Sequence, residues 1–263
     1  MSRVELMQAT GAAIAAIDTP EFPATLAGLL RRIAPYSYTV FFGFRGASRP
    51  LDLHDDFPSE KRKVFVRDYQ DGPYLLDPFF LAATRPVAAG LYRLRDLAPD
   101  RFYQGEYFRN YYVRTGLAEE IGYFVDLPGG AMIVLSLMRA EKPFSSRDLR
   151  DLAEVCPIVE ACLRRHWAGL AERIDADRVD VADHAPLTRI EQSFQTFGDG
   201  VLTQRERQIV EHTLKGHSAA AVGQILSITP GTVRIHRRNI YAKLQIGSQG
   251  ELFSKFIGTL GQD

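Results

Sequence analysis

Four basic side chains lie close together in the stretch TPGTVRIHRRNIYAKL, which runs from Thr229 to Leu244. Arg234 and Arg238 are four residues apart, so on a helix they share one face. The planar fork of an arginine can bond O6 and N7 of a guanine together. Apolar residues recur at steps of three and four on a different face: Val233, His236, Ile240 and Leu244. The spacing predicts a helix that packs on one side and presents arginines to DNA on the other.

The residues before this stretch predict the helices that must hold it. Thr203 and Glu206 have capping-box spacing at the start of one helix, and Ser218 can cap a second, shorter one. Thr229 is suited to be the N-cap of the arginine-bearing helix, with Pro230 as its first residue. Two short helices joined by a tight turn make a helix-turn-helix, whose second helix fits the major groove of DNA.

The whole stretch LTQRERQIV…GHSAAAVGQILSITPGTVRIHRRNIYAKLQIGS resembles the LuxR-type DNA-binding domain over about residues 202–257. Two departures are Gly223, where alanine is usual, and the pair Gln249–Gly250 in place of Arg-Ala or Arg-Val. A glycine inside a helix costs about 1 kcal/mol relative to alanine. The resemblance implies an all-α domain of four helices over residues 201–263. It also implies that base edges are read by Arg234, Ile235 and Arg238, and that phosphates are contacted by Thr232, Arg237 and Lys243.

The charge of the chain is divided between its two parts. The 263 residues carry no net charge, yet residues 201–263 hold 8 Lys/Arg against 4 Asp/Glu, and residues 1–200 hold 24 against 28. A basic module on an acidic body is typical of a polyanion-binding domain attached to a separate input domain. The polar, acidic stretch 174–200 is expected to be a linker with one short helix near 187–195.

The first part of the chain predicts an α+β sandwich over residues 1–173. Helices are expected at 4–17, 21–33, 60–69 and 106–116, followed by one long helix from about 146 to 173. YTVFFGFRG (38–46) has the composition of a strand, and two apolar runs flank Pro128-Gly129-Gly130 as in an antiparallel hairpin. The expected fold class is therefore an α+β sandwich sensor domain followed by the four-helix domain.

Two kinds of input to such a regulator can be distinguished by their residues: phosphorylation of a receiver domain and binding of a small molecule. A phosphorylated receiver domain needs acids after its first strand, which YTVFFGFRG lacks. The segment YLLDPFFLAATRPVAAGLYRLRDL (74–97) resembles instead the autoinducer-binding domains joined to this DNA-binding module, through Asp77-Pro78 and Asp96-Leu97. Tyr92 stands where those domains have a tryptophan. The domain is also similar to GAF- and PAS-like sensor sandwiches, which bind varied ligands.

A ligand pocket is expected to have apolar walls and few polar groups. Asp77 and Glu106 are the candidate polar anchors for an amide or amine, and the aromatic residues between the strands supply the walls. The alternative is that Asp77 only caps or turns the chain before Pro78 and that the aromatic residues are core. The predicted ligand-binding residues are Phe42, Tyr69, Tyr74, Asp77, Tyr92 and Glu106.

These features predict a cytosolic, ligand-responsive transcriptional regulator. The stretches HExxH and GxSxG and a P-loop are missing from the sequence, so no enzyme, metal or cofactor is expected. No apolar run reaches 18 residues, and Cys156 and Cys162 suggest no disulfide framework. The expected partners are double-stranded DNA, a small-molecule effector and a second copy of the chain. That copy would pack on the 146–173 helix and on Phe253, Phe256, Ile257 and Leu260. A constitutive or protein-controlled DNA-binding regulator remains the alternative.

Overall fold

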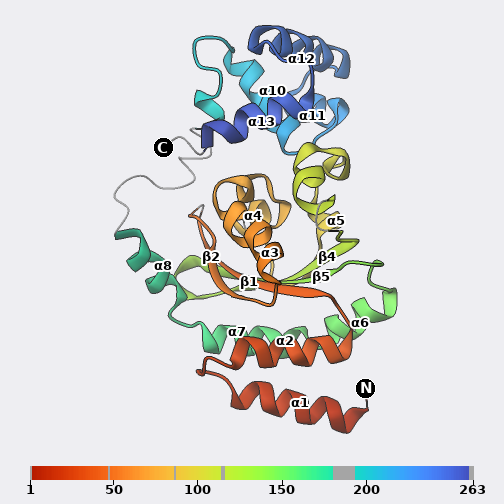
Figure 1. Cartoon of the computed structure of the whole chain (residues 1–263), viewed down its shortest axis with the longest axis vertical. Coiled ribbons are helices and arrows are strands. Elements are labelled where there is room, and N and C mark those ends of the chain that lie inside the picture. The colour runs from red at the N-terminus through yellow and green to blue at the C-terminus, as the bar shows by residue number, and fades with distance from the viewer. Residues whose placement is uncertain (1, 47, 86, 114–115, 180–192, 261–263) are drawn as a thin grey trace.

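The N-terminal part of the chain is built on one antiparallel sheet (Figure 1). The computed structural model describes residues 2–46, 48–85, 87–113, 116–179 and 193–260. Its five strands follow the order β2-β1-β5-β4-β3. They are β1 (Tyr38–Arg45), β2 (Leu51–Asp55), β3 (Gly90–Arg93), β4 (Glu119–Asp126) and β5 (Ala131–Arg139).

The predicted hairpin is confirmed by β4 and β5, which pair in antiparallel register from Glu119 opposite Arg139 to Asp126 opposite Met132. Gly129 and Gly130 both take positive φ in the connecting turn, a conformation that glycine adopts without steric cost. The predicted strand at 38–46 is also confirmed. In β1 the residues alternate, so Phe42 and Phe44 face one layer of helices while Phe41 faces the other.

One face of the sheet is covered by helices from both ends of the domain (Figure 1). They are α2 (Phe22–Ile33), α6 (Ser146–Glu154), α7 (Cys156–His166) and α8 (Leu170–Val179). The first helix, α1 (Arg3–Ala15), packs on α2 on the side away from the sheet. Trp167 packs between Phe22 and Phe41 in the core of this layer, with ring centroids 5.7 Å from each. The single long helix expected from 146 to 173 is wrong. It is broken into α6, α7 and α8, and Pro157 lies in the first turn of α7, where proline is tolerated.

The other face is covered by short helices that come from the middle of the chain. They are α3 (Ser59–Arg62), η1 (Lys63–Asp68), η2 (Pro73–Leu76), α4 (Pro78–Ala83), α5 (Leu94–Leu97), η3 (Phe102–Gln104) and η4 (Phe108–Tyr112). The helix expected at 60–69 becomes α3 followed by the π-helical η1. Within the range expected at 106–116, the described residues form the π-helical η4; residues 114–115 lie outside the described residues. Gly122 lets α4 approach the sheet, since a Cβ there would lie 2.8 Å from the Phe79 ring.

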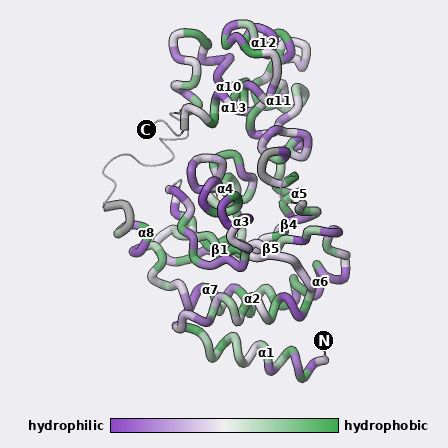
Figure 2. Tube along the Cα trace, viewed as in Figure 1, coloured by the Kyte–Doolittle hydropathy of each residue, from purple (hydrophilic) through white to green (hydrophobic). Residues whose placement is uncertain are grey.

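Four helices form the C-terminal domain, as predicted: α10 (Gln204–Leu214), α11 (Ala219–Leu226), α12 (Pro230–Leu244) and α13 (Gln249–Leu260). Thr203 forms its capping box with Glu206, and Thr229 caps α12. Val233, Ile240 and Leu244 are buried. Along α12 hydrophilic and hydrophobic residues alternate, as Figure 2 shows. The expected fold class, an α+β sandwich followed by a four-helix helix-turn-helix domain, is confirmed.

Aromatic residues before α10 close the core of this domain. Phe194 stacks on Phe256 with ring centroids 4.4 Å apart, and Phe197 contacts the same ring edge-on. Phe253 and Phe256 are consequently buried inside the chain, which corrects their predicted place on a dimer surface. Residues 193–196 are helical, at the end of the helix expected near 187–195. The rest of that prediction, with most of the linker, lies outside the described residues.

Candidate functional site

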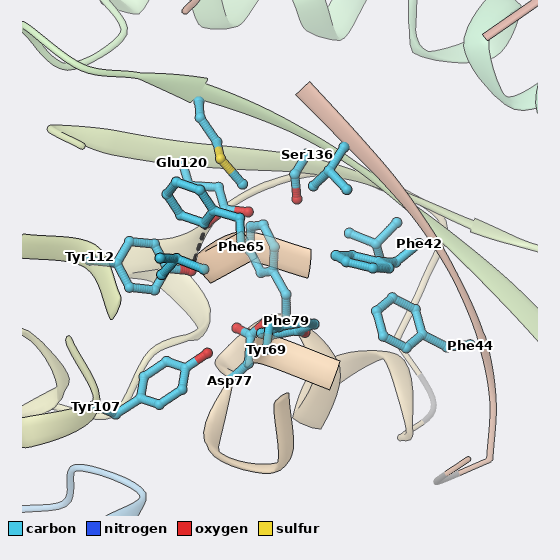
Figure 3. A pocket seen from close by; sticks show the side chains of 14 residues that line it. Phe42, Phe44, Phe65, Tyr69, Asp77, Phe79, Tyr107, Tyr112, Glu120 and Ser136 are labelled. Atoms are coloured by element: carbon cyan, nitrogen blue, oxygen red, sulfur yellow. Dashed lines mark hydrogen bonds between the residues drawn. The ribbon is translucent and has the colours of Figure 1, made fainter. Parts of the chain in front are cut away.

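A small cavity lies between the sheet and the layer of short helices (Figure 3). Its free volume is about 30 Å³, which is room for roughly two water molecules. Most of its walls are aromatic or aliphatic, and two carboxyl groups, Asp77 and Glu120, face it. The lining consists of Val40, Phe42, Phe44, Val64, Phe65, Tyr69, Asp77, Phe79, Tyr107, Tyr112, Glu120, Val134, Ser136 and Met138.

Asp77 is fixed on the helical side of the cavity. It is the N-cap of α4, where Oδ1 accepts a hydrogen bond of 2.9 Å from the backbone N–H of Phe79. Oδ2 accepts a hydrogen bond of 2.7 Å from the hydroxyl of Tyr69. Burial raises the pKa of Asp77 to about 6, although both hydrogen bonds act in the opposite direction. Asp77 is therefore both the cap that the alternative interpretation expected and a wall of the cavity.

Glu120 faces the cavity from the sheet, on β4. Its Oε2 accepts a hydrogen bond of 2.6 Å from the hydroxyl of Tyr112 (Figure 3). Burial raises the pKa of Glu120 to about 7, and the charge of Asp77 adds to this effect, against hydrogen bonds from Tyr112 and Ser136. Two acids of raised pKa thus share one small, mostly apolar cavity, an arrangement found more often at functional sites than elsewhere.

Three of the six predicted ligand-binding residues line the cavity, and three do not. Phe42, Tyr69 and Asp77 line the cavity, as expected. Tyr74 lies behind Tyr69, with its ring against Phe80. The other two predicted residues are not part of the cavity lining. Tyr92 packs edge-on against Phe124 and donates its hydroxyl hydrogen bond to the carbonyl of Ala88. Glu106 lies beside Gly250 of α13.

Sequence reasoning missed Glu120 as a polar group of the cavity. The adjacent Glu119 is buried on the opposite face of β4, where it forms ion pairs with Arg93 and Arg95. In a strand successive side chains point to opposite faces. Phe42 and Phe44 already marked the cavity face of β1, but the pairing register that puts Glu120 on the same face comes only from the sheet.

The face of α12 that was predicted to read DNA is exposed. Arg234 and Arg238 are exposed, and Ile235 is 54% exposed despite being apolar. Thr232 lies in the first turn, where its backbone N–H and hydroxyl are bonded to Thr229 Oγ1. An apolar side chain between two arginines on an open helix face suits contact with a base pair in a major groove.

The other two predicted phosphate contacts are used inside the chain. Lys243 Nζ pairs with Glu206 Oε2 at 2.7 Å and so ties α12 to the capping box of α10. Arg237 is half-buried and donates a hydrogen bond of 3.2 Å to Gln249 Oε1 of α13. Burial lowers the pKa of Arg237, and Arg101 acts in the same direction. Both side chains are therefore held by contacts within the chain, although Lys243 is also exposed.

The two domains meet at residues 100–112, which we call the junction segment. The backbone N–H of Arg101 donates a hydrogen bond of 2.9 Å to the carbonyl of Gly216, and Asp100 Oδ1 accepts one of 2.9 Å from the N–H of Ser218. Gly216 has a φ of +92°, and a Cβ on it would lie 2.8 Å from Cα of Phe102. The turn between α10 and α11 thus rests directly on the N-terminal domain.

Within the ranges that the structure describes, no group of three or more His, Cys, Asp or Glu side chains is placed to hold a metal ion. No described helix is both long and apolar enough to cross a membrane.

The fold and the exposed α12 define a two-domain DNA-binding regulator, and comparison with known proteins gives its family. Residues 200–256 match the model of the bacterial regulatory proteins of the luxR family. The chain is 32% identical over 186 residues to a protein of Aeromonas salmonicida named as an HTH-type transcriptional regulator in the exeN 3' region. That alignment covers 70% of this chain and 94% of the relative. The chain belongs to the luxR family of bacterial regulatory proteins.

Two further similarities agree with this assignment. The monoamine regulon transcriptional regulator of Klebsiella aerogenes is 24% identical over 228 residues, 86% of each chain. The crystal structure of the VqsR LBD domain from Pseudomonas aeruginosa is 27% identical, with a TM-score of 0.55. It covers 61% of this chain and 95% of that one. The luxR family and the relatives from Aeromonas salmonicida and Klebsiella aerogenes are all named as regulatory proteins and not as enzymes.

Proposed function

We propose that the chain is a ligand-responsive transcriptional regulator of the cytosol. A small molecule in the cavity of the sensor domain (1–173) controls how the DNA-binding domain (201–263) binds its operator, across the linker 174–200. The observation that carries the proposal is the junction segment, which lines the cavity with Tyr107 and Tyr112 and contacts the DNA-binding domain with Asp100, Arg101 and Phe102. Similarity to the VqsR LBD domain supports a sensing role for this sandwich.

The junction segment offers a physical route between the two sites. A ligand changes DNA affinity only if it binds two arrangements of the protein with different free energies. A molecule that enters the cavity must displace or contact Tyr107 and Tyr112, because these rings form part of its wall. Movement of the junction segment would change the contact between residues 100–102 and the Gly216–Ser218 turn, which precedes the helix-turn-helix.

For DNA, we propose that α12 enters the major groove with Arg234 and Arg238 on base edges and Ile235 between them. Thr232 is placed at a phosphate beside the start of the helix. Arg237 and Lys243 are left out of the proposed interface, because each is held by a contact within the chain. Since one helix reads only a few base pairs, we propose that a homodimer binds two half-sites.

The test begins with operator sequences selected from random DNA by the full-length protein. Small molecules released by denaturing the purified parent are identified by mass spectrometry, and the same is done for Phe42→Trp, which adds bulk inside the cavity. The parent is expected to release a molecule that the variant does not hold. Adding that molecule back should change operator affinity at least ~5-fold, the low end of common allosteric couplings.

The contrary result is also specific. If the parent releases nothing, and the small-molecule fraction of cell extract leaves its operator affinity unchanged, the sensor proposal is wrong. The chain is then a constitutive or protein-controlled regulator. Retained operator binding by Phe42→Trp serves as the check that the variant is folded.

A further inference from the structure

We infer that the cavity takes a small organic cation with a primary ammonium group, held between the carboxyl groups of Asp77 and Glu120. The inference rests on the proposed sensing function and names the chemical class of its ligand. Three features of the cavity carry it: the placement of the two acids, the charges around them and the size of the space.

The two acids come from opposite walls. Figure 3 shows Glu120 and Ser136 on the sheet side and Asp77 and Tyr69 on the helical side. Both acids are more than nine-tenths buried, with exposed fractions of 6% for Asp77 and 5% for Glu120. An ammonium group has three hydrogen-bond donors, so a single one can bond acceptors on both walls.

The second feature is the lack of a positive charge at these acids. None of the fourteen described residues that line the cavity is a lysine, arginine or histidine. Elsewhere the chain provides cations for its buried acids: Arg93 and Arg95 pair with Glu119, and Lys243 pairs with Glu206. A buried carboxylate without a counter-charge costs free energy, and the pKa values of Asp77 and Glu120 rise accordingly. A bound cation would supply the missing charge.

The other groups that face the acids do not supply that charge. Tyr69, Tyr107, Tyr112 and Ser136 carry only hydroxyl groups, and burial raises the pKa of Tyr69 and of Tyr112 well above its usual value, so both stay neutral. Aromatic rings nevertheless favour a cation, because their faces are electron-rich. Phe42, Tyr69 and Phe65 contribute such rings to the wall.

The third feature is size. A free volume of about 30 Å³ admits an ammonium group with a short substituent, whereas a long acyl chain would require several aromatic side chains to move. The cavity therefore favours a short amine over a long, neutral amide.

The experiment compares amines with alcohols of the same shape on the full-length protein. Methylamine is paired with methanol and ethylamine with ethanol, and binding is measured by calorimetry at about pH 6 and about pH 8. At least one amine is expected to bind saturably, at least ~10-fold more tightly than its alcohol. Binding should be tighter at the higher pH, since the amine itself stays protonated across this range. Proton release is expected at about pH 6, where the two acids are still partly protonated.

Variants then locate the binding groups. Asp77→Asn and Glu120→Gln keep the shapes of the side chains and are each expected to weaken amine binding at least ~10-fold. Glu106→Gln, which changes an acid outside the cavity, is the matched control and should bind amines like the parent. The thermal transition of each variant reports whether it is folded. The comparison of amines with alcohols on the parent needs no variant at all.

Three results would overturn the inference: alcohols that bind as tightly as amines, no saturable binding by any amine, or unchanged amine binding in both Asp77→Asn and Glu120→Gln. None of these decides the sensing function itself. A neutral molecule released from the parent but not from Phe42→Trp would keep the sensor and replace only the ligand class.

Discussion

The hydroxyl of Tyr112 donates a hydrogen bond of 2.6 Å to Oε2 of Glu120. This bond joins the junction segment, on which the DNA-binding domain rests, to the central sheet of the N-terminal domain. Tyr112 is buried and stacks on Phe108 of the same short helix, with ring centroids 5.4 Å apart. Tyr112 and Glu120 both line the cavity, so this contact links the cavity to the junction segment.

Replacing Tyr112 by phenylalanine tests this link. The change removes one buried hydrogen bond and leaves Glu120 with one donor fewer, so the free energy of unfolding should fall by about 1–2 kcal/mol. The operator affinity of the ligand-free protein should remain within about 2-fold of the parent, while its response to ligand is reduced. Fluorescence anisotropy on labelled operator measures both. Tyr103→Phe, on the same segment but 44% exposed, should behave like the parent; an equal loss in both variants would argue against the link.

The raised pKa values predict how stability depends on pH. In the folded protein Asp77 titrates near 6 and Glu120 near 7, above their ordinary values of 3.8 and 4.5. At a pH between the ordinary and the folded pKa of each acid, the folded state therefore binds more protons than the unfolded state. The free energy of unfolding consequently falls as the pH rises through the folded pKa values. Glu120→Gln should reduce the loss of stability between about pH 5 and about pH 8 by roughly 2–4 kcal/mol. Urea unfolding at several pH values measures this, and a slope equal to that of the parent would contradict it.

Arginine variants of α12 test the proposed readout. Arg234→Ala or Arg238→Ala should cost ~1–3 kcal/mol on the selected operator and relax base preference at one position. Lys243→Ala should instead lower stability by about 1 kcal/mol, because Glu206 would lose its cation, and should leave the salt dependence of DNA binding nearly unchanged. Binding titrations at several salt concentrations separate the two effects. If Lys243→Ala flattened the salt dependence instead, Lys243 would be a phosphate contact after all.

Gly223 gives a prediction whose sign depends on tertiary structure. Helix propensity alone predicts that Gly223→Ala stabilises α11 by about 1 kcal/mol. In the structure a Cβ at this position would lie 2.7 Å from the carbonyl oxygen of Ile228, in the turn that leads to α12. We therefore expect the substitution to destabilise the protein and lower its melting temperature. Gly258→Ala, in α13 with nothing within 4 Å of its Cβ, is the control and should stabilise.

Gly216→Ala tests the contact between the DNA-binding domain and the junction segment. The added Cβ would meet the backbone of Phe102, and a φ of +92° is strained for alanine. Asp100→Ala removes only the acceptor for the N–H of Ser218 and avoids that strain. Both variants should loosen the contact between the domains and weaken the ligand response of operator binding. Small-angle X-ray scattering should show a more extended particle. Unchanged scattering and an unchanged response in both variants would show that this contact is not used.

The DNA-binding domain could be predicted from sequence because its signals are local. The N-cap Thr229, the following Pro230 and the apolar seam of α12 act within a few residues of one another. The partners of the two predicted phosphate contacts, Arg237 and Lys243, could not be predicted in this way. Lys243 is 37 residues from Glu206, and Arg237 is 12 residues from Gln249. An arginine or lysine on a helix gives no local signal of such a partner.

By itself the sequence determined the helix-turn-helix, the hairpin, and three members of the cavity, Phe42, Tyr69 and Asp77. The helix-turn-helix and the hairpin depend on capping and on turn residues, and Phe42 depends on the alternation of one strand; short-range sterics and hydrogen bonds decide these. Tyr69 and Asp77 were predicted from the resemblance to autoinducer-binding domains. Only the tertiary structure decided that Glu120 shares the cavity with Asp77 and that Glu106 does not. Strand register and the packing of the short helices bring those acids together or keep them apart, and both depend on contacts between residues distant in the chain.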